Sequence, residues 1–257
     1  MKGIKEQMQK ISREIIYKAG QFMDTQNYPV YKKQGQRVRK GKPTSEVQQK
    51  INERNSKLKL TRLMHANFTS DDIEIHLTYS DDCLPVDARE ALKDIQNYIR
   101  RLRKYYKGKE LKYITVTETG AENGRFHHHI TISGGVSRDI LEEEWKKGFA
   151  NSKRLQFTDK GLQGLAHYMT KQKLAFRRYN CSKNLVKPTE KVRHNVITEK
   201  KLKEMYQYQE QNGEKLLIEK YTDFLAKLYP GYKISELKIV ENGVNQGYYM
   251  RVFGKKI

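Results

Sequence analysis

Two adjacent segments with strand-like alternation constrain the fold more than any other feature of this 257-residue chain. Residues 111–119 read LKYITVTET, residues 126–133 read FHHHITIS, and the polar stretch GAENGR separates them. Alternating apolar and polar residues on both sides of a short, glycine-containing loop predict an antiparallel β-hairpin. We therefore expect a sheet built around this hairpin.

The elements predicted around the hairpin place the chain in the α+β class. Strands are expected at 73–80, 154–158 and 176–186, and a second hairpin is expected at 232–254. Helical spacing of apolar residues is found at 3–19, 45–64, 87–106, 137–148, 159–174 and 197–228. Asp87 and Ser137 are expected to cap the third and fourth of these helices. This order predicts a mostly antiparallel central sheet with flanking helices, related to the split β-α-β type.

The charge balance indicates a polyanionic partner. The chain carries 51 Lys and Arg against 30 Asp and Glu, which gives a formal net charge of +21. Self-repulsion of such a charge destabilises a compact fold unless a partner neutralises it. Nucleic acid is the first candidate partner, an anionic membrane surface the second, and a basic protein without such a partner is the third interpretation. The segments 31–63 and 171–203 each contain eleven Lys and Arg and only two Asp and Glu.

Cysteine content and hydropathy favour a cytoplasmic location. Cys83 and Cys181 are too few for a disulfide framework or a cysteine-based zinc site, and they fit a reducing compartment. Residues 1–20 are too polar for a signal peptide, and no run approaches 18 apolar residues. We therefore expect a cytoplasmic protein without a membrane partner.

The histidines of the predicted hairpin form a candidate metal site. On a strand, His127 and His129 project to one face and His128 projects to the other. We predict no chemical role for His128. Antiparallel pairing brings Glu118 near the two histidines, and His76 on the 73–80 strand could approach the same face. A His-His-Glu set with open positions suits Mn²⁺ or Mg²⁺ in the presence of phosphate oxygens. The alternative is a set of exposed histidines without a ligand.

A tyrosine follows on the helix predicted for 159–174. Tyr168 and Lys171 lie three positions apart and therefore share a helix face. A tyrosine hydroxyl becomes an effective nucleophile when a nearby cation stabilises its phenolate. An ordinary half-buried tyrosine beside a surface lysine gives the same pattern, so the order of the motifs carries the argument.

Three motifs follow one another in a specific order. They are IHLTYS at 75–80, TETGAENGRFHHHITIS at 117–133 and HYMTKQ at 167–172. This order resembles the HUH endonuclease superfamily, and in particular the rolling-circle replication initiator (Rep) proteins of bacterial plasmids and phages. The three motifs resemble its first strand motif, its metal motif and its nucleophile motif, and the resemblance covers about residues 36–190.

The resemblance implies a mechanism and a set of partners. His127, His129 and Glu118 would bind the divalent metal, Tyr168 would attack the scissile phosphate, and Lys171 would assist. The products would be a 5′-phosphotyrosine and a free 3′-OH, which primes replication and later attacks the phosphotyrosine to rejoin the strand. The DNA partner would be single-stranded or hairpin DNA at an origin in a bacterial cytoplasm. No Walker A motif follows, so a host helicase and polymerase are expected partners.

The resemblance also predicts domains and DNA contacts. A basic N-terminal arm with helices spans 1–63, the HUH nuclease domain spans 64–190, and a helix and hairpin span 191–257, whose packing on the same domain stays open. Tyr79 either stacks on unpaired bases or packs in the sheet. Seven basic residues are expected to contact DNA phosphates: Arg37, Arg39, Lys40, Lys42, Arg177, Arg178 and Lys183.

Other functions remain open on the sequence. A transposase or a conjugative relaxase would use the same chemistry, and relaxases commonly have three metal histidines. A non-catalytic basic DNA-binding protein would bind DNA without forming a covalent adduct. A metal-dependent nuclease that uses water would cleave DNA without Tyr168.

Overall fold

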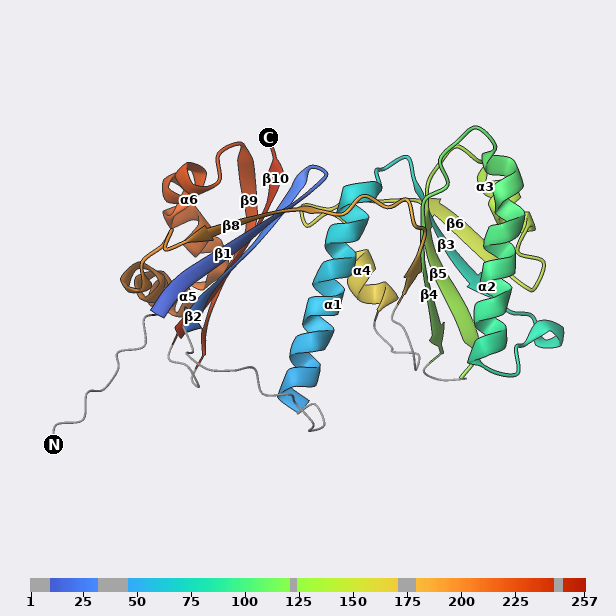
Figure 1. The fold of residues 1–257 in the computed structure, drawn as a ribbon, viewed down its shortest axis with the longest axis horizontal. Helices are drawn as coiled ribbons and strands as arrows, with labels where there is room; N and C mark the ends of the chain where they lie inside the picture. The colour runs from blue at the N-terminus through green and yellow to red at the C-terminus, as the bar shows by residue number, and fades with distance from the viewer. Residues whose placement is uncertain (1–9, 32–45, 121–123, 171–178, 243–246) are drawn as a thin grey trace. The chain divides into compact units, whose positions relative to one another are not determined.

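The computed structural model describes residues 10–31, 46–120, 124–170, 179–242 and 247–257 (Figure 1). Its contacts divide the chain into two compact units. Residues 52–187 form the first, here called the central unit. Residues 1–51 and 188–257 together form the second, here called the outer unit.

The central unit is built on a five-stranded sheet of described residues, in the order β6-β3-β5-β4-β7, in which each pair is antiparallel. The expected hairpin is confirmed, because its two strands pair directly and Glu118 lies opposite His127. The five strands of this sheet are β3 (Ile73–Thr78), β4 (Tyr113–Thr119), β5 (Phe126–Ile132), β6 (Ala150–Arg154) and β7 (Asn180–Cys181).

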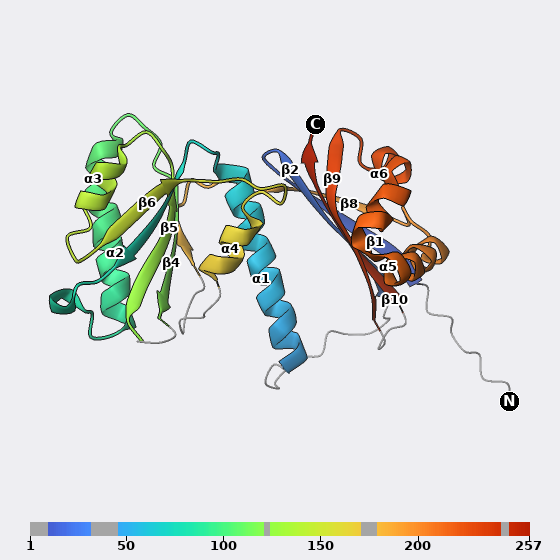
Figure 2. The ribbon, with the colours of Figure 1, turned by 180° about the vertical axis from the view of Figure 1, so that it is seen from behind.

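Helices cover both faces of this sheet. Ile73, Ile75 and Leu77 of β3 pack in one cluster with helix residues such as Ile95. Val116 of β4, on the other face, packs in a different cluster with side chains from two further helices. The helices are α1 (Glu46–Asn67), α2 (Ala88–Leu102), α3 (Arg138–Glu143) and α4 (Gln163–Met169), with 3₁₀ turns at Asp81–Cys83 and Arg103–Tyr106. Figure 2 shows α2 and α3 on one side of the sheet and α4 on the other.

Local capping explains where two of these helices begin. The Asp87 carboxylate accepts hydrogen bonds from the backbone N–H groups of Arg89 and Glu90 at 2.9 and 2.8 Å. The Ser137 hydroxyl accepts one from the backbone N–H of Ile140 at 3.4 Å. Such caps satisfy N–H groups that have no partner in the first turn of a helix. Both caps are those predicted from the sequence.

The outer unit contains a second five-stranded antiparallel sheet of described residues, in the order β8-β1-β2-β10-β9. Its strands are β1 (Lys10–Ala19), β2 (Phe22–Tyr31), β8 (Thr189–His194), β9 (Tyr232–Asn242) and β10 (Gly247–Lys256). Side chains of α5 (Glu199–Lys220) and α6 (Thr222–Leu228) pack in one core with this sheet. The α+β class is thereby confirmed, with two sheets in place of one central sheet.

The helix predicted for 3–19 is wrong over the part that the structure describes. Residues 10–19 form β1, which pairs with β2 on one side and β8 on the other. The spacing of Ile11, Ile15 and Ile16 fits a helix, but the β-branched side chains fit a strand equally well, and pairing with distant strands decides between them.

Other boundaries also shift. The strand expected at 154–158 lies earlier, as β6, and the helix expected from Asp159 begins at Gln163. The sequence-based boundaries treat 1–63 and 191–257 as separate segments, whereas β1 and β2 pair with β8 and β10 in one sheet. No helix of the described residues is long and apolar enough to cross a bilayer.

Candidate metal centre and its tyrosine

Strand register gathers the predicted metal-site residues on one face of the central sheet. His129 on β5 lies directly opposite His76 on β3, and His127 lies opposite Glu118 on β4. Residues directly opposite in an antiparallel pair share a face, and so do positions two apart on one strand. Three neighbouring strands therefore each contribute to a single cluster.

The cluster has the dimensions of a cation site. One nitrogen from each of His76, His127 and His129 lies within 4.8 Å of the others, so this group could hold a metal ion. Glu118 Oε2 lies 3.7 Å from His127 Nε2 and 3.9 Å from His129 Nε2. The rings of His76 and His129 stack, with centroids 4.7 Å apart. His76 thus joins the three residues on which the prediction centred.

The electrostatics of the cluster favour neutral, ligand-competent imidazoles. Burial and the nearby His127 lower the pKa of His76. Burial, with repulsion from His76, His127 and Lys153, lowers the pKa of His129 to about 3. A neutral imidazole offers a lone pair to a metal. The buried Nδ1 of His129 has no hydrogen-bond partner among the described residues. These features fit a divalent cation with nitrogen and oxygen ligands.

His128 takes a different role on the opposite face. Its side chain is fully buried beside Trp145, with ring centroids 5.5 Å apart. Its Nε2 lies 2.8 Å from the Tyr79 hydroxyl, and its Nδ1 lies 2.8 Å from Thr117 Oγ1. Burial, followed by repulsion from the other three histidines, lowers its pKa to about 3. His128 is therefore a neutral, doubly hydrogen-bonded core residue.

Tyr168 lies beside the histidine cluster. Its ring centroid is 5.1 Å from that of His129, with the rings at 74°. Tyr168 is 57% exposed, so a substrate can reach this residue. Helix α4 carries this residue, and Thr131 on β5 contacts Met169 of α4 through a 3.7 Å hydroxyl–sulfur hydrogen bond. The fold therefore brings the tyrosine motif and the histidine motif together.

One supporting residue escaped sequence reasoning. The backbone N–H of Leu162, just before α4, donates to Nε2 of the buried His65 at 2.8 Å. His65 lies on α1 and binds the residue that precedes the tyrosine helix. Nothing local in the sequence marks this role, because the two residues are 97 positions apart.

The remaining predicted residues divide into three groups. Tyr79 is 3% exposed and bonded to His128, so the prediction that it stacks on bases is wrong and its core role holds. Lys183 is exposed in the turn after β7. The other predicted functional residues lie outside the described part of the chain: Arg37, Arg39, Lys40, Lys42, Lys171, Arg177 and Arg178.

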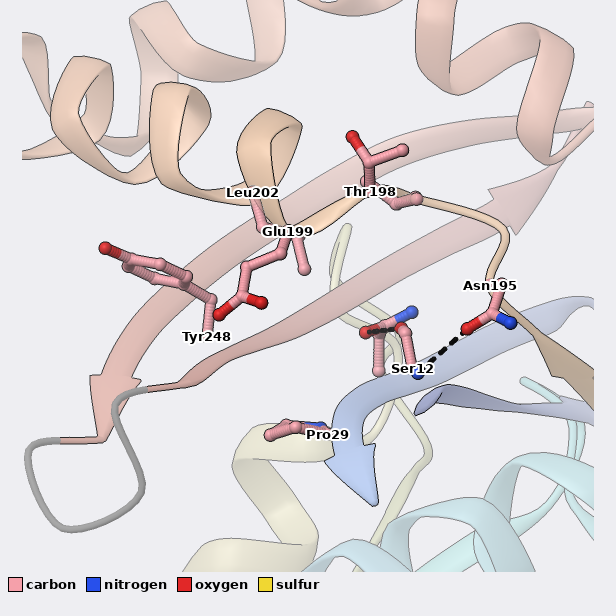
Figure 3. Close-up of a pocket in the computed structure, with 9 residues that line it drawn as sticks. Ser12, Pro29, Asn195, Thr198, Glu199, Leu202 and Tyr248 are labelled. Carbon is pink, nitrogen blue, oxygen red and sulfur yellow. Dashed lines mark hydrogen bonds between the residues drawn. The ribbon is translucent and has the colours of Figure 1, made fainter. Parts of the chain in front are cut away.

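A pocket of about 250 Å³ lies within the outer unit, lined by strand residues and the start of α5 (Figure 3). There the backbone N–H of Ser12 donates to Asn195 Oδ1 at 3.0 Å. Glu199 and Tyr248 also line the pocket. None of the predicted site residues is among its lining residues, so the pocket is separate from the histidine cluster.

A model of a known protein family matches the segment that contains both the histidine cluster and the tyrosine. Residues 73–173, less than half of the chain, match the model of a family of replication-associated proteins of the ORF2 type. This segment is similar to that family. The match runs from the start of β3 past the end of α4, so the replication-associated segment contains His76, Glu118, His127, His129 and Tyr168.

The family match indicates the function only in broad terms. A replication-associated domain implies a role in DNA replication, with DNA as the partner. No curated protein and no solved structure matches the chain. The resemblance to Rep proteins found in the sequence agrees with the replication-associated assignment.

Proposed function

We propose that the chain is a rolling-circle replication initiator that nicks and rejoins single-stranded DNA at an origin through a tyrosine. One observation carries the proposal: the exposed Tyr168 lies against His129 in a cluster that could hold a metal ion. The replication-associated assignment of the same segment supports it. DNA cutting by tyrosine needs a nucleophile and a centre of positive charge at the same phosphate, and this site offers both.

The residues take distinct roles in this reaction. His76, His127, His129 and Glu118 would hold a divalent metal, Mn²⁺ or Mg²⁺. When bound, the metal would polarise the phosphate and stabilise the charge that develops on it. The Tyr168 oxygen, losing its proton, would bond to phosphorus while the bond from phosphorus to the 3′ oxygen breaks. The 3′ oxygen takes up a proton, and the reverse attack later restores the strand.

The supporting groups are also proposals. Lys171, three residues after Tyr168, would assist at the nucleophile. Phosphates of single-stranded or hairpin DNA would meet basic residues after β7, including the exposed Lys183. Unwinding and synthesis at the nicked origin would fall to a host helicase and polymerase, in a bacterial cytoplasm.

A second candidate function has a specific observation in its favour. The cluster contains three histidines, His76 together with His127 and His129. Three metal histidines are the pattern expected of a conjugative relaxase, which nicks DNA by the same tyrosine chemistry. The replication-associated family assignment favours the initiator, and both functions share the test that follows.

The deciding experiment is incubation with a single-stranded DNA library and Mn²⁺, resolved on a denaturing gel. We expect a covalent protein–DNA band that disappears in Tyr168→Phe and when EDTA removes the metal. Tyr179→Phe is the matched control, because this half-buried tyrosine packs against the core beside α4. Sequencing the adduct gives the nick site.

Two outcomes would contradict the proposal. Cleavage that persists in Tyr168→Phe without an adduct would indicate a nuclease that uses water. If the unsubstituted chain and Tyr168→Phe bind DNA equally well and neither cleaves it with any metal, the chain would be a non-catalytic DNA-binding protein.

A further inference from the structure

The rear face of β5 carries an unusual polar link directly behind the metal cluster. His128 has no exposed surface, yet both its ring nitrogens have partners at 2.8 Å. One partner, Thr117 Oγ1, comes from β4, and the other, the Tyr79 hydroxyl, comes from the residue after β3. One imidazole therefore connects three segments from the side opposite the metal cluster.

These three segments are the ones that carry the front-face groups. His128 lies between His127 and His129, and Thr117 precedes Glu118. Tyr79 follows the strand that holds His76. A side chain fixed on one face of a strand also fixes where its two neighbours project on the other face. The link is thus placed to set the relative positions of all four front-face groups.

We propose that His128 is a positioning residue for the metal site, which it serves from the rear face through Thr117 and Tyr79. It does not touch the metal or the DNA, and the inference rests on the proposed function of the front-face cluster. The nearest apolar alternative, a bulky aliphatic residue, would fill the same volume beside Trp145 but would not connect the strands.

The hydrogen-bond directions complete the link. The Tyr79 hydroxyl donates to Asp94 Oδ2 at 3.4 Å, so it must accept from Nε2–H of His128. Nδ1 of His128 is then the acceptor for the Thr117 hydroxyl. Lys147 Nζ, at 2.9 Å from Asp94 Oδ1, pairs with the last group of this hydrogen-bonded series. The arrangement assigns His128 the Nε2–H tautomer and leaves each of the linked side chains Thr117, His128, Tyr79 and Asp94 with a partner.

The test separates positioning from mere packing. The triple variant His128→Leu/Tyr79→Phe/Thr117→Val replaces the polar link by apolar groups of similar volume, so that no polar atom of the three linked side chains is left unpaired. Asp94 loses the Tyr79 hydroxyl as a donor but keeps its ion pair with Lys147. Co²⁺ binding is measured by visible absorption, with far-UV circular dichroism and thermal unfolding on the same samples. We expect a folded protein whose Kd for Co²⁺ is at least tenfold higher than that of the unsubstituted chain, with an altered absorption spectrum.

A matched control keeps the comparison local. Ile130→Val changes the next rear-face residue of β5, which is fully buried and makes no polar link. Its Kd for Co²⁺ should stay within about twofold of that of the unsubstituted chain. A triple variant that binds Co²⁺ with unchanged Kd and spectrum would overturn the positioning role.

A second measurement does not depend on the variant folding. Nitrogen-15 NMR of the unsubstituted protein distinguishes histidine tautomers, and we expect His128 as the Nε2–H form. The opposite tautomer, or a ring exchanging between both tautomers, would refute the link.

The two proposals can fail separately. If the unsubstituted protein neither binds Co²⁺ nor forms an adduct, the proposed function fails. If it does both while the triple variant matches it, only the positioning role fails.

Discussion

At the scale of single residues, the buried histidines of β5 make the stability of the folded state depend on pH. Burial is the main cause that lowers the pKa of both His128 and His129 to about 3, against an ordinary value of 6.5. Between these values the unfolded chain binds protons that the folded chain does not. Stability is therefore fully present above pH 6.5 and is lost as the pH falls toward 3.

We expect the free energy of unfolding of the central unit to fall by about 1.4 kcal/mol per pH unit for each of these histidines. The measurement is urea unfolding at pH 7, 6 and 5 in metal-free buffer. Trp145, the single tryptophan, reports on this unit because it is buried in its core. His128→Leu should show a shallower pH dependence. Equal slopes in the two proteins would show that His128 does not contribute.

The same residues show what a strand pattern can and cannot predict. Alternation alone places His127 and His129 on one face and His128 on the other, because side-chain direction along a strand is a local property. The partners of His128 could not be predicted, since Tyr79 and Thr117 meet it only through the pairing of three strands. His76 belongs to the cluster for a similar reason, because the register of β3 against β5 places it opposite His129.

At the scale of elements, close backbone contact fixes the entry into β6. Gly148 adopts φ +147°, and a Cβ there would lie 2.4 Å from Ser80 N and 2.5 Å from Thr78 O. These atoms belong to the backbone on either side of Tyr79, which bonds His128. Only glycine permits this approach, because no flexible side chain can yield.

Gly148→Ala should therefore destabilise the protein by about 1–3 kcal/mol, the usual range for overpacking. Thermal or urea unfolding followed by Trp145 fluorescence measures the effect. Gly164→Ala is the matched control, because its Cβ would meet no heavy atom within 4 Å and it lies on α4. There we expect no loss, or a gain of up to about 1 kcal/mol from the helix propensity of alanine. Similar losses at both positions would contradict the argument.

Elements differ in how far the sequence predicts them. Helix α2 is predicted with its Asp87 cap, because capping and amphipathic spacing lie within one segment. The sequence pattern predicts a helix where β1 lies, because the pairing partners β2 and β8 are elsewhere in the chain. The predicted start of α4 is four residues too early. The backbone N–H of Leu162, the residue before α4, bonds to His65 of α1, and this distant partner is not visible in the local sequence.

At the scale of the whole molecule, a buried ion pair joins distant parts of the chain within the outer unit. Glu14 of β1 is fully buried, and Arg193 Nε of β8 donates to its Oε2 at 2.6 Å. The Tyr229 hydroxyl donates to its other oxygen. Burial and the Glu14 carboxylate raise the pKa of this tyrosine. The carboxylate thus connects segments that are about 200 residues apart in sequence.

Glu14→Ala should cost about 3 kcal/mol, because it leaves the Arg193 guanidinium without this partner in a largely buried place. Far-UV circular dichroism in urea is the measurement, since the tryptophan lies in the other unit. Glu14→Gln keeps an oxygen that accepts hydrogen bonds and should cost less. A Glu14→Ala protein as stable as the unsubstituted chain would show that the pair adds nothing.

The insertion of the central unit between β2 and β8 has a consequence for synthesis on the ribosome. β2 must wait for β10, which emerges roughly 200 residues later, or roughly ten to forty seconds at ordinary translation rates. The central unit can close first, while the β2 edge stays open and able to pair with other strands. A chain that stops before β10 would keep a complete central unit beside an unpaired β2 edge, and that edge would direct the product to aggregation.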